Sequence, residues 1–428
     1  MADSLTIFAV LIVLIFLGIP VAVSIGLASL ATIYIFDLGV PLTLLPSQTF
    51  SGVDSFPLMA IPFFIFAGEI MNKAGITRRI LDLADAIVGS LKGGLTYVNV
   101  VAAMMMASIS GSGTACAAAL GVSLIPDMAS RGYSKEYAVS LTSCANVVGP
   151  IIPPSTLLIL FGYYTNTSVA ELFMGGVLPG FLIGIALMIV GTVICRKKGF
   201  RQEKAPFSGE KLKRAVIRGW AALLIPAAIF LSIIMGWTTA SEAGAIVCVL
   251  SLILGACYST ITKFSDIMEV ARGAANSTCT IFALLALSGI FANVLVRAHF
   301  QEVVADILFS LGGSPTVTLL VIVAFIFVLG MVVDVTPMVI MFAATFTAIA
   351  SDIGVDKVHF GVVFTLICMI GAVTPPVGGI LFVTTTIGKV PMTRLVPTLT
   401  PLVLTLFAVA SALVFFPSIV TALPNLLF

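Results

Sequence analysis

The sequence predicts an all-α polytopic membrane protein, and three observations lead to this fold class. Of the 428 residues, 60% are hydrophobic and only 9% are charged, whereas soluble domains are about a quarter charged. Apolar segments follow one another along the chain, and several are long enough to cross the ~30 Å hydrocarbon layer. The second half also repeats motifs of the first. Lipid must therefore be the solvent for much of the chain.

Composition and the N-terminus exclude several other classes. A net charge of +2 is too small to indicate a nucleic-acid partner. The seven cysteines are scattered through apolar segments without a CxxC pair, which favours packing roles over a disulfide framework or a zinc site. The first apolar run, 5–22, follows no basic stretch, so we predict a membrane span and not a cleavable signal. We expect no soluble domain on either side of the membrane part.

The apolar segments vary in length, and several are too short to span or are broken by Gly, Pro and Ser. They are 5–22, 23–36, 58–71, 95–107, 151–163, 172–195, 220–237, 243–258, 281–296, 317–333, 338–350, 362–372 and 395–416.

A basic loop separates the two halves at residues 196–218. It holds nine of the chain's 21 Lys and Arg residues but only two acids, Glu203 and Glu210. A charge run of this kind is usually a solvated loop, and its positive sign predicts a cytoplasmic location.

An internal repeat relates the two halves with an offset of 222 residues. The pairs at this offset are Thr114 with Thr336, Gly132 with Gly354, Lys135 with Lys357, Gly149 with Gly371, Pro153-Pro154 with Pro375-Pro376, and Pro179 with Pro401. Upstream, at offset 221, Gly68 pairs with Gly289, Asn72 with Asn293 and Asp85 with Asp306. Repeats of this size are typical of transporters that bind substrate at the repeat interface. They indicate duplication and leave open whether the second copy is inverted.

The first candidate motif is the stretch 108–115, where small polar residues and glycines interrupt an apolar run. Such a stretch suits the tip of a re-entrant hairpin, whose carbonyls and hydroxyls are hard oxygen ligands for Na⁺. Tight packing of small residues between helices is the alternative.

The second motif is the stretch 146–155, which contains Pro150, Pro153 and Pro154. Prolines remove amide donors and clash with preceding carbonyls, so we predict that a helix unwinds here, although a simple kink is the alternative. Unwinding frees carbonyls for a cation, and the new helix start near Ser155 offers amides to an anion.

The second half repeats both motifs at 330–337 and 371–376. Asp334 takes the place of Ser112 at the second tip, between two apolar runs. A carboxylate at that depth is costly and is a functional candidate, with a structural partner for another helix as the alternative. Arg297 closes the run 281–296, where it either snorkels to the interface or holds a substrate carboxylate with its planar fork.

Motifs of catalysis and ATP hydrolysis are missing from the sequence. There is no GxxxxGK[ST] phosphate loop, no HExxH and no GxSxG. We therefore expect a protein that is not an enzyme.

Three strings resemble the large membrane subunit of tripartite ATP-independent periplasmic (TRAP) transporters. They are SISGSGTACAAALG at 108–121, NVVGPIIPPS at 146–155 and GAVTPPVGG at 371–379. The likeness covers nearly the whole chain and looks strongest to the sialic acid (N-acetylneuraminate) systems.

The resemblance implies an elevator-type ion transporter in the bacterial inner membrane, with inverted repeats that each carry a re-entrant hairpin and an unwound helix. It implies Na⁺ as the coupling ion, no other cofactor, a small membrane subunit, and a periplasmic binding protein that delivers sialic acid or a similar carboxylate. A binding-protein-independent Na⁺/dicarboxylate carrier and an ion channel are the alternatives.

The resemblance also assigns site residues. The first Na⁺ site would involve Ser110, Asn146, Gly149, Ile152 and Pro154. The second would involve Gly330, Thr336, Gly371, Thr374 and Pro376. Substrate would meet Ser112, Ser155, Arg297 and Asp334.

The expected organisation has five parts. They are scaffold helices at 1–57, a first repeat with hairpin and unwound helix at 58–195, a basic cytoplasmic linker at 196–218, scaffold helices at 219–274, and a second repeat with hairpin and unwound helix at 275–428.

Overall fold

The structure is a computed structural model of the whole chain. It describes the backbone of residues 2–38, 40–91, 93–200, 208–258, 260–261, 263–300, 302 and 314–428, and side chains at these positions except 2–5, 42, 108–110, 211, 218, 221–223 and 234. Every regular element in these ranges is a helix and none is a strand, which confirms the all-α prediction.

Several of the described helices are long and apolar enough to cross a membrane. By length and composition, five qualify in the described ranges, and a sixth crossing results if a helix pair bent by 62° counts as one span. The five are α10 (Val169–Lys198), α12 (Ala240–Cys257), α13 (Phe264–Arg297), α16 (Val335–Asp352) and α19 (Met392–Phe415).

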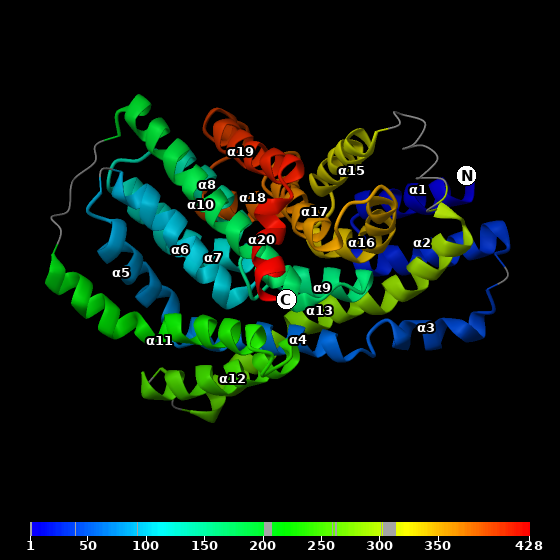
Figure 1. Cartoon of the computed structure of the whole chain (residues 1–428), viewed down its shortest axis with the longest axis horizontal. Coiled ribbons are helices and arrows are strands. Elements are labelled where there is room, and N and C mark those ends of the chain that lie inside the picture. The colour runs from blue at the N-terminus through cyan, green and yellow to red at the C-terminus, as the bar shows by residue number, and fades with distance from the viewer. Residues whose placement is uncertain are drawn as a thin grey trace.

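One group of helices forms an outer frame along the left, lower and right-hand edges of Figure 1. Besides α12 and α13, the frame consists of α1 (Ala2–Phe16), α2 (Val21–Phe36), η1 (Leu42–Leu44), α3 (Leu45–Ser51), η2 (Phe56–Met59), α4 (Ala60–Lys73), α5 (Ile76–Val88) and α11 (Gly209–Ile234). Within it α2, α3 and α4 pack on α13, α12 packs on α4, and α11 packs on α5.

The other helices form two units that the frame partly surrounds. The first unit consists of α6 (Gly94–Ser110), α7 (Gly113–Ser130), α8 (Lys135–Ala145), η3 (Asn146–Val148), α9 (Thr156–Thr165) and α10. The second consists of α15 (Pro315–Gly330), α16, α17 (Lys357–Gly371), α18 (Gly379–Gly388), α19 and α20 (Ser418–Leu427).

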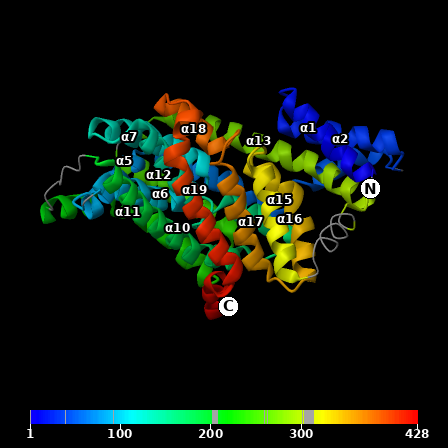
Figure 2. The same ribbon diagram turned by 90° about the horizontal axis from the view of Figure 1, so that it is seen from above.

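The two units have the same order of local structures and pack across each other. In each, two helices meet at a short tip, and a third helix ends in a break that holds a cis Pro-Pro bond. The α7 helix packs on α18, α9 packs on α16, and α8 packs on α19. Figure 2 shows α7 beside α18 from above. Their buried apolar side chains belong to one continuous core.

The basic linker is partly helical in its described residues. The α10 helix continues through Arg196, Lys197 and Lys198, and α11 begins at Gly209. Basic side chains in the last turn interact favourably with the negative end of the helix dipole. The linker residues 201–207 lie outside the described part of the chain.

Candidate functional site

The tip of the first hairpin follows from two residues between α6 and α7. Gly111 ends α6 with φ 59°, a left-handed conformation that glycine adopts without strain. Ser112 is extended, and its hydroxyl accepts a hydrogen bond from the amide of Ala115 at 3.5 Å, which caps α7. The backbone therefore reverses here between two helices, as the glycine- and serine-rich pattern predicts.

The tip packs against the first break, defined as residues 149–155. A Cβ at Gly111 would lie 2.7 Å from the carbonyl oxygen of Pro154, so only glycine fits. The Thr156 hydroxyl donates to the Gly111 carbonyl at 3.3 Å. Ser155 donates to the Pro150 carbonyl at 2.6 Å and accepts from the Leu158 amide at 3.1 Å. The predicted unwinding is present between η3 and α9.

Asn146 is fully buried beside this break. Its side-chain nitrogen donates to the Thr142 carbonyl at 2.7 Å, while its side-chain oxygen has no partner among the described atoms. The Asn146 carbonyl lies 3.0 Å from where a Cβ at Gly113 would stand. The structure thus brings the predicted ion residues of the first unit to the contact between tip and break, although the Ser110 side chain lies outside the described part.

The second unit builds the same contact with different bonds. The Met331 carbonyl at the second tip accepts hydrogen bonds from the amides of Val377 and Gly378 at 3.3 and 3.4 Å. A Cβ at Gly371 would lie 2.5 Å from the carbonyl carbon of Gly330, so these two backbones touch. The residues predicted for the second ion site, Gly330, Thr336, Gly371, Thr374 and Pro376, therefore belong to one tip, the start of α16 and the break beside it.

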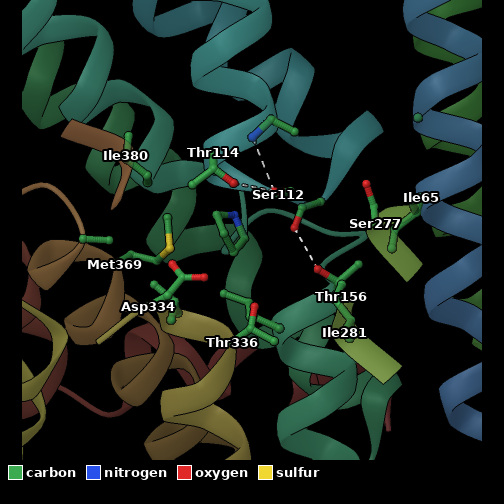
Figure 3. A pocket seen from close by; sticks show the side chains of 18 of the residues that line it. Ile65, Ser112, Thr114, Thr156, Ser277, Ile281, Asp334, Thr336, Met369 and Ile380 are labelled. Carbon is green, nitrogen blue, oxygen red and sulfur yellow. Dashed lines mark hydrogen bonds between the residues drawn. The ribbon is translucent and has the colours of Figure 1, made fainter. Parts of the chain in front are cut away.

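A cavity of about 510 Å³ lies where both tips meet the frame. Ser112, Thr114, Asp334 and Thr336 line it from the tips, and Figure 3 shows their side chains around one space. Asp334 is exposed within it and makes no side-chain capping bond to α16. The cavity size suits a small ligand.

Two predicted substrate residues do not line this cavity. Ser155 is buried within the first break. Arg297 is exposed at the end of α13, where its Nε donates to the Asn293 side chain at 2.9 Å. It lies 16 residues beyond the cavity-lining Ile281, or about 24 Å along the helix.

The frame supplies a second wall that the sequence analysis missed. Glu69 and Asn72 line the cavity from α4, and Ser277 and Thr280 line it from α13. Glu69 is a half-buried carboxylate inside the apolar run 58–71. An acid within an apolar run is costly and is therefore a functional candidate, which is the argument that identified Asp334. The same argument applied to the sequence would have identified Glu69.

Comparisons with known proteins agree with this architecture. Residues 8–419 match the family model described as "Tripartite ATP-independent periplasmic transporter, DctM component". The chain also resembles the Alcanivorax borkumensis YdaH transporter in fold, with a TM-score of 0.60, 12% identity, and coverage of 90% of this chain and 88% of that one.

Curated relatives with three named substrates are similar over nearly their whole length. The sialic acid TRAP transporter large permease SiaM of Vibrio cholerae is 33% identical, with 96% of each chain covered. The 2,3-diketo-L-gulonate permease YiaN of Escherichia coli is 35% identical, with 94% of this chain and 95% of the relative covered. The C4-dicarboxylate permease DctM of Pseudomonas aeruginosa is 32% identical, with 94% of each covered.

These matches confirm the family resemblance and the prediction that the chain is not an enzyme. Because a family model and curated large permeases both match almost the entire sequence, the chain belongs to the DctM component family, the large permeases of tripartite ATP-independent periplasmic transporters.

Proposed function

We propose that this chain couples Na⁺ entry to the uptake of a small carboxylate, with sialic acid as the first candidate. The observation that carries the proposal is the buried side-chain oxygen of Asn146, which has no partner among the described atoms. An unsatisfied buried polar group costs about 1–3 kcal/mol, and a bound cation would offset this. Broken helices provide such cation sites in other secondary transporters.

The carbonyls of the first break support the same proposal. Among the described atoms, no hydrogen bond ends on the carbonyl oxygens of Gly149, Ile152 or Pro154. With the Asn146 oxygen they form a set of hard, neutral ligands of the kind that suits Na⁺. We assign the second ion site to the corresponding contact of the second unit, where Thr336 and Thr374 contribute hydroxyls.

The substrate carboxylate is best placed at the start of α7, beside the neutral Ser112. The N-terminus of α7 lies at the cavity, and the positive end of its helix dipole attracts an anion. In this proposal Ser112 contacts the substrate carboxylate, and Asp334, itself an acid, contacts substrate hydroxyls. Ser155 acts indirectly, because its hydroxyl holds the break in shape.

The position of Arg297 fits an elevator movement. Asn72 lines the present cavity, and its repeat partner Asn293 holds Arg297 at the far end of α13. If the two units slide along the frame as one body, Arg297 meets the substrate at the other end of the movement. Spin labels on α16 and on the end of α13 test this, and a distance distribution unchanged by Na⁺ and substrate would contradict it.

The family implies further partners and a cellular location. As one component of a tripartite periplasmic system, the chain would work with a small membrane subunit and a periplasmic binding protein in the bacterial inner membrane. The basic linker 196–218 would face the cytoplasm. A single cysteine in this linker, in a background without the native ones, should stay unlabelled by an impermeant thiol reagent applied to intact spheroplasts.

Reconstitution with the small subunit tests the proposal. We expect labelled sialic acid to accumulate when a Na⁺ gradient and a sialic acid binding protein are both present, and not when ATP replaces Na⁺. Robust uptake in Na⁺-free, ATP-supplied vesicles would refute the coupling. Uptake without any soluble partner would instead favour a carrier that needs no binding protein.

A further inference from the structure

The cavity carries an unusual balance of charge. Among the described residues that line it, Glu69 and Asp334 are acidic and none is Lys, Arg or His. The basic residues nearest to Glu69 along the sequence of α4 and of the facing part of α13 are Lys73 and Arg272. Lys73 is paired with Glu269 at 2.6 Å, and neither basic residue lines the cavity.

Glu69 lies against α13 and lines the cavity. Its carboxyl carbon lies 3.9 Å from where a Cβ at Gly273 would stand. Within the described residues it forms no ion pair. Ser277 lies one turn further along α13 and also lines the cavity. Among the described residues, Glu69 is therefore a hydrogen-bond acceptor with no cation paired to it.

The rest of the lining offers neutral hydrogen-bonding groups on both walls. They are Asn72, Ser112, Thr114, Thr156, Ser277, Thr280 and Thr336. Hydroxyls and amides both donate and accept, so they match a ligand that carries many hydroxyl groups.

We propose that Glu69 is a specificity-determining residue that accepts hydrogen bonds from substrate hydroxyls, and that the substrate is a hydroxyl-rich monocarboxylate. This inference rests on the proposed function. The single carboxylate lies at the N-terminus of α7, away from the acid at the start of α16, and the hydroxylated tail extends towards α4. A dicarboxylate would place its second charge near Glu69, where no cation among the described lining residues balances it. Like charges in a partly desolvated cavity repel strongly.

Ligand binding to the purified chain with its small subunit tests the inference. The measurement is the shift of thermal unfolding with NaCl or choline chloride, alone and with sialic acid, gluconate or succinate as probes. In NaCl we expect at least one of the two hydroxylated monoacids to bind at least tenfold more tightly than succinate. Glu69→Gln should weaken that binding about tenfold and narrow the preference over succinate. Glu171→Gln, which changes another half-buried glutamate that does not line the cavity, should leave both values unchanged.

The outcomes separate this inference from the proposed function. If NaCl raises the unfolding temperature no more than choline chloride does, the proposed function itself is overturned. A second outcome is that Na⁺ stabilises the protein but succinate binds as tightly as the better-bound monoacid, or neither monoacid binds. That outcome would overturn the substrate class alone. Equal behaviour of Glu69→Gln and Glu171→Gln would overturn the role of Glu69.

Discussion

The first break and the second break, the latter defined as residues 371–377, occupy corresponding places in their units but differ in exposure. In the first, Pro154 and Ser155 are buried, and the neighbouring Asn146 offers a neutral amide oxygen. In the second, Pro376 and Val377 are exposed, and Cys368 stands at the position that corresponds to Asn146. The same backbone arrangement is therefore enclosed in the first unit and exposed at the surface of the chain in the second.

The two tips also differ, in the roles of their corresponding side chains. Ser112 uses its hydroxyl to cap α7, whereas Asp334 at the corresponding position makes no capping bond to α16. The Ser112 hydroxyl therefore contributes to the fold, while the Asp334 carboxylate accepts a hydrogen bond from the Val335 amide and lines the cavity, where it can act on a ligand. The carboxylate oxygen lies 3.4 Å from where a Cβ at Gly379 would stand, which places it beside the second break.

The largest effect is expected for Asp334→Ala. Because the carboxylate lines the cavity and caps no helix, its removal should lower Na⁺-dependent uptake at least 100-fold, a loss of about 2.7 kcal/mol or more. Unfolding temperature without ligands should stay at the parent value. Uptake by proteoliposomes of equal protein content is the measurement.

Asp352→Ala is the matched control, because Asp352 is an exposed carboxylate at the other end of α16. It should transport at the parent rate. If Asp334→Ala lowers the unfolding temperature without ligands as well as the transport rate, the carboxylate is a structural partner, and the contrast between the tips disappears.

The next effect concerns the ion pocket of the first unit. Asn146→Ala removes the orphaned oxygen, so about tenfold more Na⁺ should be needed for half-maximal thermal stabilisation, which corresponds to about 1.4 kcal/mol. Cys368→Ala, at the corresponding and equally buried position, should leave the Na⁺ requirement unchanged. Titration of purified protein with NaCl at constant ionic strength distinguishes the two. Equal shifts would mean that the two pockets are alike.

A third effect is on stability. Gly371→Ala would place a Cβ within 2.8 Å of three backbone atoms of Gly330, so α15 and α17 must move apart. Overpacking of this kind costs about 1–3 kcal/mol. Gly149→Ala, whose Cβ would have no neighbour nearer than 3.1 Å, should cost less. Thermal unfolding is the measurement, with Gly209→Ala as a control in open space. The reverse order would show that the first unit is the tighter one.

The sequence predicted the tips and breaks well because proline and glycine act on the backbone directly. The prolines at 150, 153 and 154 cannot continue a helix, and Gly111 marks the one left-handed residue of the first tip. Long helices with polar halves were harder to predict. The apolar run 281–296 covers only the second half of α13, which begins at Phe264. Its first half is polar, so a hydropathy window did not include it.

The same limitation explains the missing wall of the site. Ser277 and Thr280 lie in that polar half, and their place opposite the tips depends on how α13 packs on α4. Sequence spacing does not fix such a contact between distant helices. The expectation that Arg297 lies near Ser112 and Asp334 rested on the resemblance, and the structure does not bring it to the cavity they line.

The smallest effect tests how each tip is fastened to its break. In the first unit a side chain makes this bond, since Thr156 donates to the Gly111 carbonyl. In the second, backbone amides of Val377 and Gly378 donate to Met331. Thr156→Val keeps the shape and removes one hydrogen bond, which should cost about 0.5–1.5 kcal/mol.

Val377→Ala should cost less than about 0.5 kcal/mol, because the side chain is 47% exposed and its amide is retained. Thermal unfolding of both variants in the same detergent and buffer checks the difference. A larger loss for Val377→Ala would show that side-chain packing also fastens the second tip. A loss confined to Thr156→Val would mean that only the first unit depends on a side chain for this bond, so a substitution there can loosen one tip without changing the other.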